Sequence, residues 1–237
     1  MASVTTRTVL ITGANRGLGL EMVKQMVEGP SNPEKYIELQ ALAKSHPDAI
    51  TCAERVGSLV GPGGLNLLIN NAAVLFHVSC PFFLVNASLT YFSLCNISFS
   101  LTLVVIIMKE LLPHLRAAAL ASRTPGMSCS KAVVVNLSSM AGSMTGTPES
   151  YSRFPVMSYR ISKAALNMLT ICSALEFQKD NILSVLLHPG WVRTDMGGKE
   201  ADIDKLESVG GLLSVIDSLT EKHNGAILDY NGVSLPW

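Results

Sequence analysis

The chain has 237 residues and a mass of 25.3 kDa, with 48% hydrophobic residues, which is enough to bury one large core. Its 18 basic and 18 acidic side chains cancel, so it lacks the charge excess that marks proteins binding nucleic acid or an anionic membrane surface. The five cysteines show no C-x-x-C pair and no histidine at ligand spacing, which indicates no metal site and favours a reducing compartment.

The N-terminus runs directly into an apolar strand, without the charged and then long apolar segments of a signal peptide. We therefore expect one domain, residues 1–237, in the cytoplasm.

A strand, a glycine turn and a helix open the chain. Thr8 to Ile11 is short, β-branched and apolar, and apolar residues recur at helical spacing from Met22 to Val27. Between them lies the turn Thr12-Gly13-Ala14-Asn15-Arg16-Gly17-Leu18-Gly19. Glycines at such a turn let the backbone approach a ligand, and the helix N-terminus offers free N–H groups to a pyrophosphate. The spacing, G-x-x-x-G-x-G, differs from the G-x-G-x-x-G dinucleotide fingerprint.

The second and third strands are expected to be short. Lys35-Tyr36-Ile37 begins like a strand but passes at once into a helical pattern, and Ala49-Ile50-Thr51 does the same. The next strand, Leu65 to Ile69, is a buried run that ends in Asn70-Asn71-Ala72-Ala73. Small residues there allow a cofactor to approach, and the asparagine side chains can tie neighbouring strands together.

The stretch from Val74 to Met108 is apolar and contains no Asp, Glu, Lys or Arg. A membrane span needs about 20 apolar residues, and several serines and two asparagines interrupt this one. We favour a buried core helix from about Leu101 to Leu115 that ends near Pro113, and rank membrane association last.

Two further strands also end in polar loops. Lys131 to Leu137 is followed by Ser138-Ser139, and Ile182 to Leu187 by the loop from His188 to Met196. Both loops should open at the carboxyl edge of a parallel sheet, where ligands of open α/β sheets bind. A last helix, about Ile203 to Leu219, and a strand near Ala226 to Leu228 close the chain.

Tyr159 and Lys163 are four residues apart at the start of a helix, so they share one helix face. A positive charge beside a phenol favours its ionised form, and we expect Lys163 to lower the pKa of Tyr159. Tyr159 is then a plausible proton donor near neutral pH. Taken alone, the pair is also typical of an ordinary amphipathic helix with a half-buried tyrosine.

Taken together and in order, these motifs resemble the short-chain dehydrogenase/reductase family. The likeness is closest to the small carbonyl-reductase subgroup that includes the Sniffer and C-factor proteins, and it covers most of the chain outside about Ile37 to Glu54 and Val74 to Val104. The resemblance implies an α/β fold with a Rossmann-like, doubly wound parallel sheet. It rests on Gly13, Gly17, Gly19, Asn70-Asn71-Ala72, Ser139, Tyr159, Lys163 and Pro189-Gly190.

The resemblance also implies an NAD(P)-dependent reduction of a carbonyl to an alcohol. Tyr159 would protonate the carbonyl oxygen, Lys163 would lower the pKa of Tyr159 and hold the nicotinamide ribose, and Ser139, chosen over Ser138, would hydrogen-bond the same oxygen. The implied cofactor-binding residues are Gly13, Asn15, Arg16, Gly17, Leu18, Gly19, Asn71, Ala72, Tyr159, Lys163, Pro189, Gly190, Val192 and Thr194.

Cofactor choice rests on Arg16, which resembles the basic residue that meets the 2′-phosphate in NADP-using members, so NADP(H) is expected and NAD(H) stays an alternative. The basic residue expected after the second strand has no counterpart. For the family's active-site asparagine, Ser100 falls at the matching position and Asn96 one turn away, and neither is assigned that role.

We expect a small-molecule carbonyl substrate, no nucleic acid and no membrane, with a homodimer left open. The alternative function is a catalytically impaired relative, from a splice variant or truncated gene, that acts as a binding or scaffold protein.

Overall fold

A computed structural model describes residues 8–29, 35–39, 56–73 and 87–237, with side chains described for all of these except 35–39 and 87–100. At its centre lies one six-stranded sheet in the order β2-β1-β3-β4-β5-β6. All neighbouring strands pair in parallel. The strands are β1 (Thr8–Thr12), β2 (Lys35–Leu39), β3 (Leu67–Asn70), β4 (Val133–Leu137), β5 (Leu183–His188) and β6 (Ile227–Asp229).

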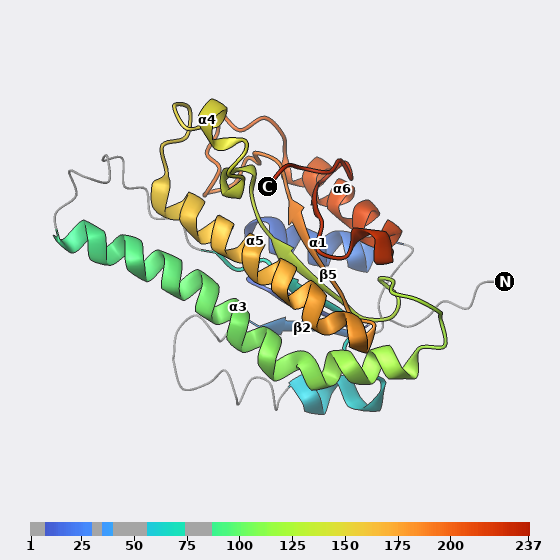
Figure 1. Cartoon of the computed structure of the whole chain (residues 1–237). Coiled ribbons are helices and arrows are strands. Elements are labelled where there is room, and N and C mark those ends of the chain that lie inside the picture. Colours follow the sequence, from blue (N-terminus) through green and yellow to red (C-terminus); the bar gives the residue numbers. More distant parts are fainter. Residues whose placement is uncertain (1–7, 30–34, 40–55, 74–86) are drawn as a thin grey trace.

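Helices cover both faces of this sheet (Figure 1). The longer helices are α1 (Gly17–Glu28), α3 (Ala87–Ala121), α5 (Met157–Phe177) and α6 (Lys205–Ser218). Short helical segments are η2 (Gly61–Gly63), η4 (Met140–Gly142), α4 (Thr147–Ser150), η5 (Gln178–Asp180) and η6 (Glu221–His223), and residues 56–60 are also helical.

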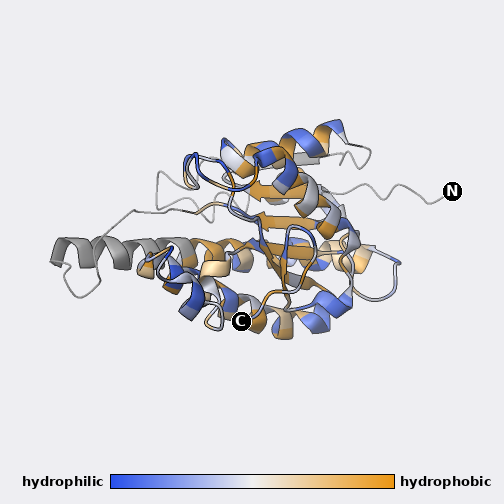
Figure 2. Ribbon diagram, turned by 90° about the horizontal axis from the view of Figure 1, so that it is seen from above, coloured by the Kyte–Doolittle hydropathy of each residue, from blue (hydrophilic) through white to orange (hydrophobic). Residues whose placement is uncertain are grey.

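The core consists of two layers, one on each side of the sheet. On one side, Met22 of α1 and Leu212 of α6 pack with strand residues such as Val135. On the other, Leu111 of α3 and Leu166 of α5 pack with residues such as Val134. In Figure 2 the strands form a hydrophobic layer between helices that carry both hydrophobic and hydrophilic residues. Strands buried on both faces are typical of parallel sheets.

The expected α/β doubly wound fold is confirmed. The chain passes from β1 to β2 on one side and then returns to β3 on the other, which makes the carboxyl ends of β1 and β3 a topological switch point. Strand β2 pairs with β1 over five residues, two more than the predicted Lys35 to Ile37. The short strand predicted at Ala49 to Thr51 lies outside the described residues.

The prediction that a core helix ends near Pro113 is wrong, because α3 runs from Ala87 to Ala121 with Pro113 inside it. A proline removes one helical hydrogen bond and strains the preceding turn. Burial on both sides of it outweighs this cost, since Leu111, Leu115 and residues 118–119 are buried. The His114 carbonyl also accepts a hydrogen bond from the Leu65 amide at 2.9 Å, just ahead of β3.

Helix α3, with 35 residues, is the longest helix that the structure describes. Among the described residues, no helix has the length and apolar character needed to cross a bilayer.

Candidate active site

The turn after β1 is shaped by two glycines with positive φ, Gly13 at 68° and Gly17 at 58°. Helix α1 then begins with Arg16 as its N-cap, and it has no side-chain cap and no acidic residue in its first turn. A Cβ built on Gly17 would meet no atom within 4 Å. An uncapped helix N-terminus beside open space suits an anion such as a pyrophosphate, so these residues fit a dinucleotide cofactor.

Gly19 and Asn71 hold the turn against β3. The Asn71 Nδ2 atom donates to the carbonyl oxygens of Thr12 at 2.9 Å and Gly13 at 3.1 Å, and the Ala72 amide donates to Thr12 Oγ1 at 3.0 Å. A Cβ on Gly19 would overlap the Gly13 carbonyl oxygen and lie 2.6 Å from Asn71 Nδ2. Glycine is therefore required at position 19 by close packing, and Asn71 ties strand ends together as its residue type predicts.

The other residues assigned to the turn differ in exposure. Asn15 and Arg16 are exposed, whereas Leu18 packs against the core on the α1 side. The Arg16 Nη1 atom lies 3.5 Å from Asp195 Oδ2, and these side chains are 73% and 88% exposed. Such an exposed pair contributes little stability, but it shows that the glycine turn and the loop after β5 approach each other.

Asn70 belongs to a buried polar chain whose other members, Asn136 and Thr170, were not singled out from the sequence. Its Nδ2 atom donates to Asn136 Oδ1 at 2.7 Å, and Asn136 Nδ2 donates to Thr170 Oγ1 at 2.8 Å. Asn70 Oδ1 is buried without a hydrogen-bond partner among the described residues. An amide inside the apolar run Val133 to Leu137 was the available signal, because a buried amide needs partners.

Helix α5 places Tyr159 and Lys163 one turn apart, beside the end of β4. The Ser139 side chain lies beside the Tyr159 phenol and acts to lower its pKa, and the Lys163 Nζ atom lies 5.6 Å from the centre of the Tyr159 ring. Lys163 is only 7% exposed, and its Nζ atom donates to the Leu137 carbonyl at 2.7 Å. The structure thus brings together the three side chains to which catalytic roles were assigned.

The expectation that the pKa of Tyr159 lies below its usual value is wrong. Burial raises the pKa of Tyr159, and the neighbouring Ser139 hydroxyl offsets only part of that effect. Burial also lowers the pKa of Lys163 to about 8. A low-dielectric site disfavours both charged forms, so Tyr159 is a neutral phenol at pH 7, which is the form that can donate a proton.

The two serines after β4 have separate partners. Ser138 is buried, and its Oγ atom donates to Asn167 Oδ1 on α5 at 2.6 Å. Ser139 is partly exposed and caps η4, where its Oγ atom accepts from the Ala141 amide at 3.1 Å. Only Ser139 therefore combines contact with Tyr159 and access to solvent.

The loop after β5 is the third part of the site. Gly190 has a φ of 83°, and the Pro189 carbonyl accepts from Ser208 Oγ at 2.6 Å. Val192 is buried and forms a bridge with Ile203. Thr194 Oγ1 accepts from the Gly197 amide at 3.0 Å. These contacts fix the loop at the carboxyl edge of the sheet.

His188, at the end of β5, pairs in register with Asp229 on β6. Burial lowers its pKa to about 4, with Asp229 opposing that shift and Lys163 adding to it. Its Nδ1 atom is buried without a partner among the described residues. His188 is therefore a neutral imidazole at pH 7.

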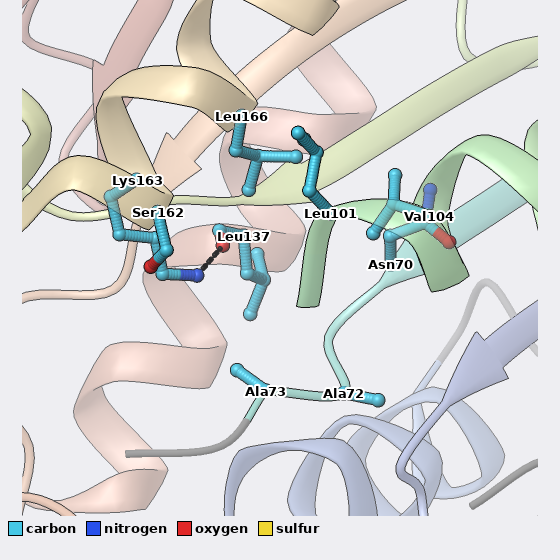
Figure 3. Close-up of a pocket in the computed structure, with 9 residues that line it drawn as sticks. All are labelled: Asn70, Ala72, Ala73, Leu101, Val104, Leu137, Ser162, Lys163 and Leu166. Atoms are coloured by element: carbon cyan, nitrogen blue, oxygen red, sulfur yellow. Dashed lines mark hydrogen bonds between the residues drawn. The ribbon is translucent and has the colours of Figure 1, made fainter. Parts of the chain in front are cut away.

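A small cavity lies beside Lys163, between α3, α5 and the end of β3 (Figure 3). It has a volume of about 10 Å³, which is room for about one water molecule. The residues around it are Asn70, Ala72, Ala73, Leu101, Val104, Leu137, Ser162, Lys163 and Leu166. The side chains of Ser100 and Asn96, which were considered for the family's asparagine, lie outside the described part.

Within the described residues, no group of three or more His, Cys, Asp or Glu side chains could hold a metal ion. The side chains to which catalytic roles were assigned at this edge are a phenol, a serine hydroxyl and a buried lysine, and they lie beside a glycine turn.

Comparison with known proteins decides the family. Residues 30–204 match the model of short chain dehydrogenases. The chain belongs to the short-chain dehydrogenase family. Across 84% of its length and 83% of the relative's, it is 32% identical to short-chain dehydrogenase anuI of Penicillium roqueforti. Over 79 residues it is 48% identical to C-signal of Myxococcus xanthus, a match spanning 33% of this chain and 48% of that protein.

Solved structures of carbonyl reductases resemble this short-chain dehydrogenase along nearly its whole length. An NADPH-bound carbonyl reductase from chicken fatty liver is 35% identical, with a TM-score of 0.87 over 98% of this chain and 94% of the other. The carbonyl reductase Sniffer of D. melanogaster is 31% identical, with a TM-score of 0.86 over 98% of this chain and 100% of the other. The predicted family and subgroup are confirmed, and the chain is an oxidoreductase by family.

Proposed function

We propose that this short-chain dehydrogenase reduces a ketone or aldehyde to an alcohol with NADPH, in the cytoplasm. The observation that carries the proposal is the placement of Tyr159, beside Ser139 and next to buried Lys163, at the same sheet edge as an uncapped, glycine-rich helix N-terminus. A proton donor beside a dinucleotide site is what carbonyl reduction requires.

The residues divide the work as follows. The Tyr159 Oη atom donates its proton to the substrate oxygen as the carbonyl carbon receives a hydride. Ser139 hydrogen-bonds the same oxygen and stabilises the negative charge that develops there. When bound, NADPH supplies the hydride. The products are the alcohol and NADP⁺, and the phenol regains its proton from solvent.

Lys163 supports this step by its position. Its ammonium lies near the Tyr159 ring, where a positive charge stabilises the phenolate that remains after proton donation. Among the described residues, its Nζ atom donates one hydrogen bond, to the Leu137 carbonyl. Since an ammonium has three donors, two remain to hold the nicotinamide ribose.

Three groups of residues would hold the cofactor. Gly13, Gly17, Leu18 and Gly19 offer the helix N-terminus to the pyrophosphate, and Asn71 and Ala72 fix that turn. Pro189, Gly190, Val192 and Thr194 bound the nicotinamide side. Exposed Arg16, with Asn15, would meet the 2′-phosphate, and the similarity to an NADPH-bound carbonyl reductase supports NADP(H) over NAD(H).

The experiment is a fluorescence titration with NADPH, followed by NADPH oxidation in the presence of aromatic and aliphatic aldehydes. We expect saturable binding and oxidation that depends on the aldehyde. An absence of saturable binding up to millimolar NADPH would rule out the proposal and favour the impaired relative. Saturable NADPH binding without carbonyl-dependent oxidation would show that the cofactor site is intact but that the chain does not catalyse the proposed reduction.

A further inference from the structure

Two loops that flank Tyr159 meet through an aromatic pair. Phe154 lies in the loop just before α5, and Trp191 lies in the loop after β5. Their ring centres are 5.1 Å apart at an interplanar angle of 84°, which is the edge-to-face geometry that aromatic pairs prefer. Both residues are partly exposed, so the pair presents ring surface to solvent.

This pair is held in place from both sides. The Trp191 Nε1 atom donates to the Gly197 carbonyl at 2.8 Å. The Phe154 carbonyl accepts from Arg160 Nε at 3.1 Å, and Arg160 directly follows Tyr159 on α5. The aromatic pair is therefore fixed to the helix that carries the proposed proton donor, and it can act as a rigid wall for a substrate.

Arg153 lies over this wall. Its Cζ atom is 5.5 Å from the centre of the Phe154 ring and 5.2 Å from that of the Trp191 ring. Arg153 is exposed. Among the described residues it forms no ion pair with an Asp or Glu side chain. Contact with ring faces holds a guanidinium in place, while its planar fork of N–H donors stays available for a carboxylate.

We propose that Arg153, Phe154 and Trp191 form a recognition site for the acidic group of the substrate. The substrate class is then aromatic carbonyl compounds that also carry a carboxylate, with the rings contacting the flat body and Arg153 pairing with the anion. This inference rests on the proposed function and adds the substrate class to it.

Recognition of the acidic group is measured as the ratio of the kcat/KM values for two matched aldehydes, 4-formylbenzoate and 4-formylbenzamide. They differ only in that the first carries a carboxylate and the second a neutral amide. We expect the wild type to favour 4-formylbenzoate by about fivefold, the upper end of the range for an ion pair at an exposed site. The preference should shrink with added salt, because solvent ions screen an exposed pair.

Variants separate recognition from folding. In Arg153→Gln the ratio should fall to about 1 while kcat/KM for the neutral amide stays within about threefold, since only the charged contact is lost. Arg153→Lys keeps the charge without the fork and should restore part of the preference. Arg123→Gln removes the same charge between α3 and β4, at the opposite edge of the sheet, and should leave the ratio unchanged.

Three outcomes would overturn the inference. Arg153→Gln could retain the wild-type ratio, or Arg123→Gln could lower it equally, or the wild type could show no preference for the acid while still reducing the amide. In each case carbonyl reduction itself survives. If the wild type binds NADPH but reduces neither aldehyde, the proposed function fails and the substrate class fails with it.

Discussion

Tyr159 shows what residue spacing can predict and what it cannot. Four-residue spacing correctly placed Tyr159 and Lys163 on one face of α5, 5.6 Å apart. It gave the wrong sign for the pKa of Tyr159, because that value depends on burial by the surrounding fold, which cannot be seen in a local motif. The hydrogen bond from Lys163 to the Leu137 carbonyl was also beyond sequence reasoning.

A pair of serine variants tests the choice of Ser139 as the active hydroxyl. Ser139→Ala should lower kcat/KM by about 10²- to 10³-fold, because it removes a donor to the developing oxyanion. Ser138→Ala should instead lower the free energy of unfolding by about 1–3 kcal/mol, because it leaves the buried Asn167 Oδ1 without its donor. Steady-state kinetics and urea unfolding of both variants measure this. If Ser138→Ala lowered kcat/KM more than Ser139→Ala did, and the two variants were equally stable, the wrong serine would have been chosen.

The pH dependence of carbonyl reduction follows from two shifted groups. The raised pKa of Tyr159 keeps the proton on the phenol across the neutral range. The Lys163 ammonium, with a pKa of about 8, is present below that pH and is lost as the pH rises through it. We expect kcat/KM to be flat from about pH 6 to 7 and to fall by about tenfold per unit above pH 8. A value of kcat/KM that rises as the pH passes 8 would contradict the role given to the Lys163 ammonium.

At the scale of elements, apolar runs bounded by polar loops predicted most strands well. β4, β5 and β6 lie within one or two residues of their expected positions, because strands buried on both faces leave a continuous apolar signal. The predicted helix ended near Pro113, whereas α3 continues to Ala121. A proline is a strong local stop signal, and the burial that overrides it is a tertiary effect. The chain from Asn70 through Asn136 to Thr170 joins three elements, and no pattern within one element shows it.

The start of α1 gives a prediction about an element. Gly19→Ala places a Cβ against the Gly13 carbonyl and Asn71 Nδ2, so the turn must shift. We expect NADPH affinity to fall at least about tenfold and the free energy of unfolding to fall by about 1–3 kcal/mol. NADPH titration and thermal unfolding measure both.

Gly210→Ala on α6 is the matched control. Its Cβ would meet only Gln25 Oε1, at 3.6 Å, an ordinary contact. This variant should raise stability by up to about 1 kcal/mol, since alanine favours a helix over glycine, and leave NADPH affinity unchanged. Equal loss of NADPH affinity in both variants would mean that position 19 has no special place in the cofactor site.

At the scale of the whole molecule, the sheet brings together three loops that are far apart in the sequence, after β1, β4 and β5. Parallel pairing alone places their carboxyl ends on one edge, which is why the site could be predicted once the strands were found. The Arg153, Phe154 and Trp191 contacts could not, because they depend on how two loops fold back toward each other.

Folding of residues 1–237 as one unit stays a prediction, and NADPH binding tests it. We expect one thermal transition that shifts upward with NADPH. At 100 times Kd the added stability is about 2.7 kcal/mol, which corresponds to a rise in Tm of about 5–10 °C for a chain of this size. Two separate transitions, with only one of them moved by NADPH, would indicate two units.

The central claim is that Tyr159 protonates a carbonyl while NADPH supplies the hydride. The most direct measurement is a single-turnover reaction of an aldehyde with enzyme saturated by NADPH deuterated at the transferred position, comparing the wild type with Tyr159→Phe. The account predicts one deuterium on the alcohol carbon for the wild type and a rate about 10²- to 10⁴-fold lower for Tyr159→Phe with NADPH affinity retained. Deuterium transfer by Tyr159→Phe at the wild-type rate, or an alcohol without deuterium, would contradict it.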